Sequence, residues 1–219
     1  MTLGLRSLIC HTVKTWLDAN PSEGMSVAQS YMMPPCQHLL VLSLLIVNAD
    51  GFSPTAYDAL FKSAGLDTMS YAPPSASIPA TQWPTLASLI NSGKRVVTFM
   101  DASADFNSVP YIIDGATPEI SIVACSDDHP EFTNIWETAY DVTTTFDCSV
   151  NRTQGDASTQ MMLINHFLDT LVLGQPVPDP SQANHTNAVS GPNSLGQQAS
   201  LCASEYGRYP NFMLVDVSP

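Results

Sequence analysis

Residues 81–101, TQWPTLASLINSGKRVVTFMD, predict one helix, one turn and one strand that ends on a carboxylate. Three apolar residues recur at helical spacing and form one stripe: Leu86, Leu89 and Ile90. Pro84 suits the first helical turn, and Gly93 can adopt the left-handed conformation that closes a helix. The run 96–100 is apolar and rich in β-branched residues, which is typical of a strand buried on both faces, and Asp101 ends it.

The same unit recurs along the chain. Further helices are predicted at residues 13–19, 53–65, 156–173 and 199–206, and further strands at 8–11, 44–47 and 211–215. Four of the strands end on a polar residue: His11, Asn48, Asp101 and Asp216. A helix that feeds a buried strand with a polar C-terminal end is the repeating unit of an α/β barrel, whose chemistry occurs at these strand ends. The repetition favours a parallel barrel in one domain over residues 1–219.

The charge of the chain limits the classes of partner that it can bind. Twenty acidic and seven basic residues give a net charge of −13, and no cluster of Lys and Arg occurs. Nucleic acid and anionic membrane surfaces are therefore poor partners unless a metal intervenes. The apolar run 38–49 is too short to span a bilayer, so no stable membrane span is expected.

Several features are typical of secreted proteins. Charged residues make up only 12% of the chain, and two N-x-Thr sequons are potential glycosylation sites at Asn151 and Asn184. The N-terminal sequence MTLGLRSLICHTV, with one Arg and a short broken apolar run, does not match a secretion signal. The five cysteines include no C-x-x-C pair, which disfavours a structural zinc site and leaves one cysteine unpaired if disulfides form.

Most of residues 12–216 resembles the fungal PLC-like phosphodiesterases, secreted relatives of phosphatidylinositol-specific phospholipase C. The segments that carry the resemblance follow the family's order and include VKTWLDANP, LLIVNAD, ATQWPTLASLINSGKRVVTFMD, FTNIWETAYDVT, FDCSVNRTQGD, STQMMLINHFLD and YGRYPNFMLVD. The resemblance implies a TIM (β/α)8 barrel. Family members begin with a half that carries a Gly-Ala-His-Asp-like segment and a strand with an arginine, and nothing here matches either. We therefore expect an incomplete barrel, covering the C-terminal half to two-thirds.

The resemblance also implies roles for individual residues. His11, in the run Leu-Ile-Cys-His-Thr, resembles the family's second catalytic histidine, and Asp216 resembles the aspartate that orients the first histidine. Cys148 and Cys202 resemble a cysteine pair that can be bridged, which would leave Cys10 without its partner.

Cleavage of a phosphodiester needs a base, an acid and positive charge against the developing phosphorane. If the chain works as the family does, His11 would be the acid. In this chain we favour the interpretation that His11 is an N-terminal residue without structured neighbours. The resemblance implies a monomeric phosphoric diester hydrolase that acts on a phosphodiester or phospholipid-type small substrate without a cofactor. The chain itself is expected to be inactive, and a non-catalytic barrel fragment or binding protein is the alternative.

Three further residues are candidates for binding substrate hydroxyls or a divalent metal: Asn48, Asp101 and Glu137. Carboxylates at strand ends also often cap the next helix, so a structural role remains open for them. Two of Asp101, Glu137 and Asp216 would suit a glycosidase if they lay roughly 5 to 10 Å apart across a sugar-sized cleft. His166 is interpreted as a core-edge histidine that holds a backbone group, and Lys94 and Arg95 as structural cations.

Residues 24–40 and 115–130 interrupt the resemblance and lack any sustained helical or strand period. Retained introns would explain both inserts, and two ordinary surface insertions are the alternative. On the intron account we expect transcript reads in which codon 23 is joined to the codons of the LLIVN segment. Abundant messages that keep both inserts in frame, with peptides from them in culture fluid, would show the intron account to be wrong.

Overall fold

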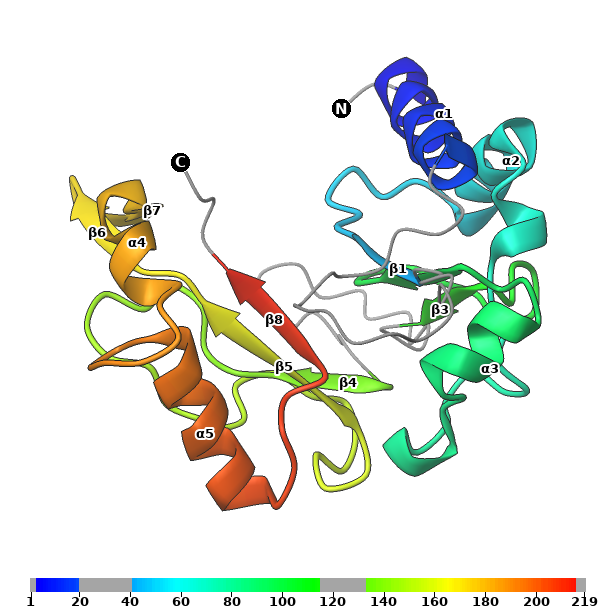
Figure 1. Ribbon diagram of the computed structural model, residues 1–219. Helices are drawn as coiled ribbons and strands as arrows, with labels where there is room; N and C mark the ends of the chain where they lie inside the picture. Colours follow the sequence, from blue (N-terminus) through cyan, green and yellow to red (C-terminus); the bar gives the residue numbers. More distant parts are fainter. Residues whose placement is uncertain (1–2, 20–40, 115–132, 216–219) are drawn as a thin grey trace, which may run out of the picture. The chain divides into compact units, whose positions relative to one another are not determined.

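The computed structural model describes residues 3–19, 41–114 and 133–215 (Figure 1). The described chain forms two units: one comprises residues 3–19, 41–78 and 82–114, and the other comprises residues 79–81 and 133–215. Asp216 and both predicted inserts lie outside the described residues. These residues form no closed barrel, so the incomplete TIM barrel stays a prediction.

The first unit is built on a parallel sheet of three strands in the order β1-β2-β3: Leu42–Ile46, Val96–Met100 and Ile112–Asp114. Its helices are α1 (Leu3–Ala19), α2 (Pro54–Ala64) and α3 (Leu86–Asn91). Short 3-10 turns cover Asp67–Met69 in the first unit, Pro180–Gln182 in the second, and Ala80–Gln82, whose first two residues belong to the second unit. The predicted strands at 44–47 and 96–100 are confirmed, and all five residues of β2 are buried.

Local capping explains where α2 and α3 begin and end. The Ser53 hydroxyl accepts a hydrogen bond from the Ala56 N–H at the start of α2, and Gly65, with φ 74°, closes that helix. Thr85 caps α3 in the same way, so Pro84 precedes the cap and does not lie in the first helical turn as predicted. Gly93 has the expected left-handed conformation, with φ 72°.

The predicted strand at 8–11 is wrong, because α1 is one helix of 17 residues that includes it. Cys10, Val13 and Leu17 are spaced by three and four residues and all pack on the same core cluster. The short apolar run that predicted a strand is therefore part of a helical stripe, and the predicted helix at 13–19 is its second half.

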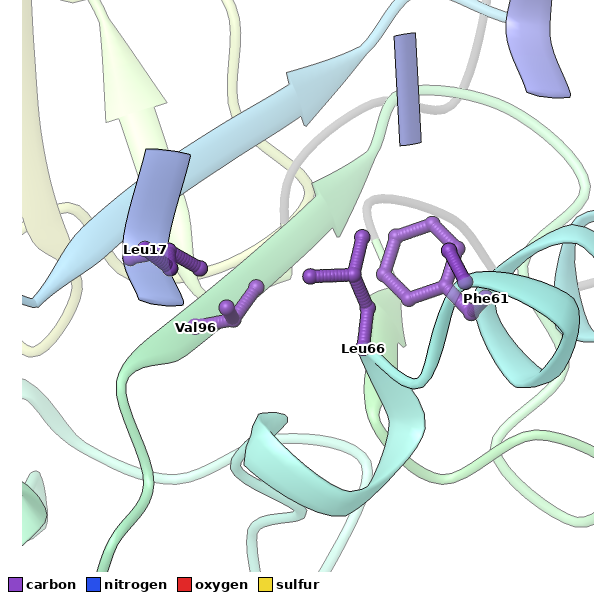
Figure 2. Close-up of a cluster of buried hydrophobic side chains, with 5 residues drawn as sticks. Leu17, Phe61, Leu66 and Val96 are labelled. Carbon is purple, nitrogen blue, oxygen red and sulfur yellow. The ribbon is translucent and has the colours of Figure 1, made fainter. Parts of the chain in front are cut away.

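A compact apolar cluster joins α1, α2 and the sheet. Figure 2 shows Leu17, Phe61, Leu66 and Val96 converging from three different segments of the chain. Alternate residues of β1 pack against this cluster from the sheet: Leu42, Leu44 and Ile46. The buried guanidinium of Arg95 donates from Nη1 to the Leu17 carbonyl oxygen at 2.9 Å, which fixes the end of α1 to the start of β2. Arg95 has the structural role that was predicted for it.

The second unit contains another parallel sheet, in the order β4-β5-β8: Ile135–Glu137, Met161–His166 and Phe212–Val215. Its helices are α4 (Ala183–Thr186) and α5 (Leu195–Tyr206), and a separate hairpin pairs β6 (Asp169–Val172) with β7 (Gln175–Pro178). The expected disulfide between Cys148 and Cys202 is present, with the Cα atoms 5.3 Å apart. It packs with Trp136, Met162 and Ile164 of the sheet, and it ties α5 to the loop that contains Cys148.

The helix predicted at 156–173 is wrong, because this stretch forms β5 and β6. All six residues of β5 are buried, since β4 and β8 flank the strand on its two edges and other segments cover its faces. A continuous apolar run looks the same for a buried strand and a buried helix, and only the neighbouring strands decide between them.

Replacing Phe61 with alanine tests the core of the first unit. Phe61 is 2% exposed, so Phe61→Ala should lower the free energy of unfolding by about 3–5 kcal/mol through lost burial and a cavity. The matched control is Leu86→Ala on α3, where a side chain that is 65% exposed should change stability by less than about 0.5 kcal/mol. Urea unfolding followed by circular dichroism measures both variants. Equal stabilities would contradict the proposed core.

Candidate functional site

Two predicted site residues, Asn48 and Asp101, lie together at the carboxyl end of the first parallel sheet. Asn48 follows β1 and Asp101 follows β2, and these two strands are neighbours in register. The main-chain N–H of Asn48 donates to Asp101 Oδ1 at 2.8 Å. The Asp101 N–H in turn donates to the Ile46 carbonyl oxygen at 3.1 Å. The carboxylate of Asp101 is partly exposed, and one of its two oxygens is occupied by this contact.

The side chain of Asn48 bonds its own loop, the residue after Asp101 and the start of α2. Its Nδ2 donates to the carbonyl oxygens of Phe52 at 2.9 Å and Ala102 at 3.2 Å. Its Oδ1 accepts from the Phe52 N–H at 3.1 Å and from the Tyr57 hydroxyl at 2.9 Å. Asn48 is only 3% exposed, and these four bonds use both its donor and its acceptor capacity. The geometry therefore gives Asn48 a positioning role in the loop after β1.

Arg6 and Tyr57 join this edge of the sheet from α1 and α2, and neither was predicted from the sequence. Arg6 donates to the Tyr57 hydroxyl and, at 2.5 Å, to Asp50 Oδ2, and its guanidinium lies 4.6 Å from the Phe52 ring centroid. Burial raises the pKa of Tyr57, with Asp50 and Asp101 adding to the shift and Arg6 opposing it. The four polar side chains of this edge, Arg6, Asn48, Tyr57 and Asp101, are called the strand-end cluster below. Their partners lie far away in the sequence, which explains why no local pattern identified Arg6 or Tyr57.

His11 is not part of the strand-end cluster. It lies on the exposed side of α1, while Cys10, the residue before it, packs toward the core. The His11 side chain makes no hydrogen bond to another described residue, and Asp216, which resembles the aspartate of the missing first histidine, lies outside the described residues. Burial raises the pKa of the Cys10 thiol, which bonds no second cysteine in the described part of the chain. The catalytic roles of His11 and Asp216 stay predictions.

In the second unit Glu137, at the end of β4, forms an ion pair with Arg152. The carboxylate is almost fully buried, with 4% of its side chain exposed, whereas 35% of the Arg152 side chain is exposed. The Arg152 guanidinium also lies 4.7 Å from the centroid of the Tyr140 ring. Because Glu137 is a buried partner of a cation, its observed contacts are those of a structural residue. Arg152 was not predicted, since sequence reasoning treated it only as the middle residue of a sequon.

His166, the last residue of β5, is fully buried and forms a hydrogen bond with a main-chain group, as predicted. Its Nε2 lies 2.8 Å from the Thr186 carbonyl oxygen and donates to it, since a carbonyl oxygen can only accept. Its Nδ1 lies 2.6 Å from Gln198 Oε1, and the Gln198 amide nitrogen donates to the Asp147 carbonyl oxygen. These contacts join β5 to α4 and α5.

All seven basic side chains of the sequence lie among the described residues, and each one donates to a carboxylate or a carbonyl oxygen. Carboxylates accept from four of them, in the pairs Arg6–Asp50, Lys14–Asp18, Lys62–Asp58 and Arg152–Glu137. Carbonyl oxygens accept from the other three, Lys94, Arg95 and Arg208. An incoming phosphate would therefore have to compete with an existing partner for any of these cations.

Neither a metal centre nor a membrane span is present within the described ranges. No group of three or more His, Cys, Asp and Glu side chains is placed there to hold a metal ion. The helices found in the same residues are all too short or too polar to cross a bilayer. The asparagines of both sequons, Asn151 and Asn184, are exposed, and their glycosylation stays a prediction.

Comparisons with known proteins identify relatives of the chain. Residues 4–218 match the family model described as PI-PLC X 1. The chain is 35% identical to "PI-PLC X domain-containing protein 1" of Arthroderma benhamiae, over 97% of this chain and 60% of that protein. It is 39% identical to an "Uncharacterized secreted protein" of the same fungus, over 80% of this chain and 38% of that protein. The chain thus spans three-fifths or less of the length of these two relatives, and no solved structure matches it.

Two substitutions test which residues of the strand-end cluster are needed for stability. Asn48→Ala should strongly destabilise the protein, because each buried group left unpaired costs about 1–3 kcal/mol and Tyr57 and Phe52 both lose a partner. Asp101→Asn keeps an oxygen that can accept from the Asn48 N–H, so its cost should be below about 1 kcal/mol. Urea unfolding of both variants measures the difference. A larger loss in Asp101→Asn than in Asn48→Ala would contradict these assignments.

Proposed function

The chain belongs to the PI-PLC X family, and we propose that the protein is a secreted phosphoric diester hydrolase that acts on phospholipid-type substrates. The family match over residues 4–218 is the observation that carries the proposal. The name of one relative, which describes a secreted protein, supports an extracellular location. The disulfide between Cys148 and Cys202 is consistent with such an oxidising compartment.

In this proposal the substrate lies at the carboxyl ends of the parallel strands, where Asp101 is partly exposed. A carboxylate accepts hydrogen bonds from hydroxyl groups, and Asp101 has an oxygen besides the one that Asn48 occupies. Asn48 would act through Asp101, because its main-chain N–H fixes the orientation of the carboxylate. This arrangement suits a head group rich in hydroxyls.

We further propose that residues 1–219 alone have little hydrolytic activity. Cleavage needs a proton donor, a proton acceptor and a cation placed around one phosphorus atom. His11 is exposed on α1, His166 is buried between backbone and amide groups, and the basic side chains all have partners. Neither His11 nor His166 is therefore placed beside a second proton-transfer group and a cation that is ready for a phosphate.

A non-catalytic role, in which the chain binds a ligand as a barrel fragment, is the second candidate. The engagement of every basic side chain with a protein oxygen favours it, since a binding surface needs no cation to stabilise a phosphorane. The glycosidase alternative receives no such support. Glu137 is buried in an ion pair with Arg152.

Hydrolysis of a soluble inositol phosphodiester by the purified chain tests the proposal about activity. We expect a rate within about twofold of the His11→Ala variant, because removal of a true member of a catalytic unit costs several orders of magnitude. A rate that falls about a hundredfold or more in His11→Ala would overturn the inactivity proposal and support hydrolysis through His11. If transcripts yield a longer product, the same assay on that product tests the hydrolase class itself, with a glycoside substrate as the control.

A further inference from the structure

The β6–β7 hairpin of the second unit presents apolar side chains to solvent on both of its faces. Leu171 is 62% exposed, Val172 52%, Leu173 99% and Val177 40%. Leu171 pairs across the hairpin with Pro176, whereas Val172 and Val177 lie on the opposite face. Beyond the buried Asp169 every residue of both strands is exposed, so no described segment covers either face. The four apolar residues Leu171, Val172, Leu173 and Val177 are called the hairpin tip below.

The turn of this hairpin holds a leucine in a conformation that leucine rarely adopts. Leu173 has φ 53° and Gly174 has φ 80°, the pair of positive values that a two-residue type I′ turn requires. The other non-glycine residues with positive φ among the described residues are polar: Ser103, Asp141 and Asn193. An asparagine would fit the position of Leu173 with less strain and would hydrate better. Folding alone therefore does not explain a fully exposed leucine there, and such an outlier points to a function.

The base of the hairpin is fixed while its tip projects. The Asp169 N–H donates to the Val142 carbonyl oxygen at 2.8 Å, and the Asp179 N–H donates to the Leu168 carbonyl oxygen at 2.8 Å. Both Leu168 and Asp169 are buried. The hairpin begins three residues after His166, at the carboxyl end of β5, which is the edge of the sheet where chemistry occurs in α/β barrels.

We propose that the hairpin tip docks the protein to an electrically neutral lipid surface, where its apolar side chains enter the interface. Residues 170–178 contain no charged side chain, so insertion of the tip carries no cost for burying a charge. The chain has a net charge of −13, which opposes binding to anionic lipid and selects a zwitterionic surface. This inference rests on the proposed function, because an enzyme that acts on phospholipid-type substrates must reach a lipid surface.

Docking to a second protein chain fits the hairpin less well. Pro176 and Pro178 lack N–H donors, which prevents an added strand from pairing regularly along β7. Each strand of the hairpin has four residues, whereas a stable protein interface uses about 20–30 residues from each partner. A small convex apolar tip matches a deformable surface better than a rigid one.

Partition of residues 1–219 onto phosphatidylcholine vesicles, measured by flotation, tests the inference without any hydrolysis. The wild-type chain should float with the vesicles, and Leu173→Asn should lower the partition coefficient by about tenfold or more, as expected when one buried leucine side chain is lost. Asparagine favours the type I′ turn, so this variant should keep its fold and its melting temperature. Val172→Thr, which preserves strand propensity, should weaken binding in the same direction.

The matched control is Val189→Asn, which removes an apolar side chain that is 89% exposed elsewhere in the same unit and should leave partition unchanged. Adding phosphatidylserine to the vesicles should weaken binding of the wild-type chain. Absence of vesicle binding, or equal binding by wild type and Leu173→Asn, would overturn the inference. So would a Leu173→Asn variant whose oligomeric state changes while its vesicle partition does not. Vesicle binding by residues 1–219, with no phosphodiester hydrolysis by a longer transcript product, would leave the hairpin inference standing while the proposed function failed.

Discussion

The first unit depends on the burial of β2 on both of its faces. All five residues from Val96 to Met100 are buried, and β2 is the only strand of that described sheet with a neighbour on each edge. Two polar residues bracket this apolar strand. Arg95 before it binds the end of α1 through the Leu17 carbonyl oxygen, and Asp101 after it binds the loop that follows β1 through the Asn48 N–H. The strand thus supplies the core, and its two polar ends position the helix and the loop around that core.

The same arrangement explains why strand-end residues are ambiguous as functional candidates. The carboxyl end of a buried parallel strand exposes main-chain groups that need partners, and a polar side chain placed there satisfies them. Asn48 is fully used in this way and Asp101 is used in part, whereas Glu137 is drawn into an ion pair with Arg152. A residue can contact a substrate only if it has hydrogen-bonding capacity left after these structural bonds. The residue type alone does not decide this. By that measure Asp101 is the strongest of the three.

Local sequence signals identified the parts of the fold whose contacts are themselves local. Residues 53–65 and 96–100 were predicted correctly because a cap, a glycine stop or a run of β-branched residues lies inside each segment. Residues 8–11 and 156–173 were mispredicted because their conformations depend on packing against distant segments, α2 in one case and β4 and β8 in the other. The strand-end cluster was only partly predicted, for the same reason. Asn48 and Asp101 end their own strands, but Arg6 and Tyr57 reach that edge only through tertiary packing.

The charge distribution sets a further condition on any substrate. The chain is strongly acidic, and its basic side chains already bond protein oxygens, so an anionic group gains little from the described surface. Displacing Glu137 from Arg152 would leave a buried carboxylate unpaired, which is more costly than the contact that a phosphate would gain. Recognition by these residues must therefore use the neutral parts of a ligand. Hydroxyl groups suit Asp101 in the first unit, and apolar groups suit the hairpin tip in the second unit.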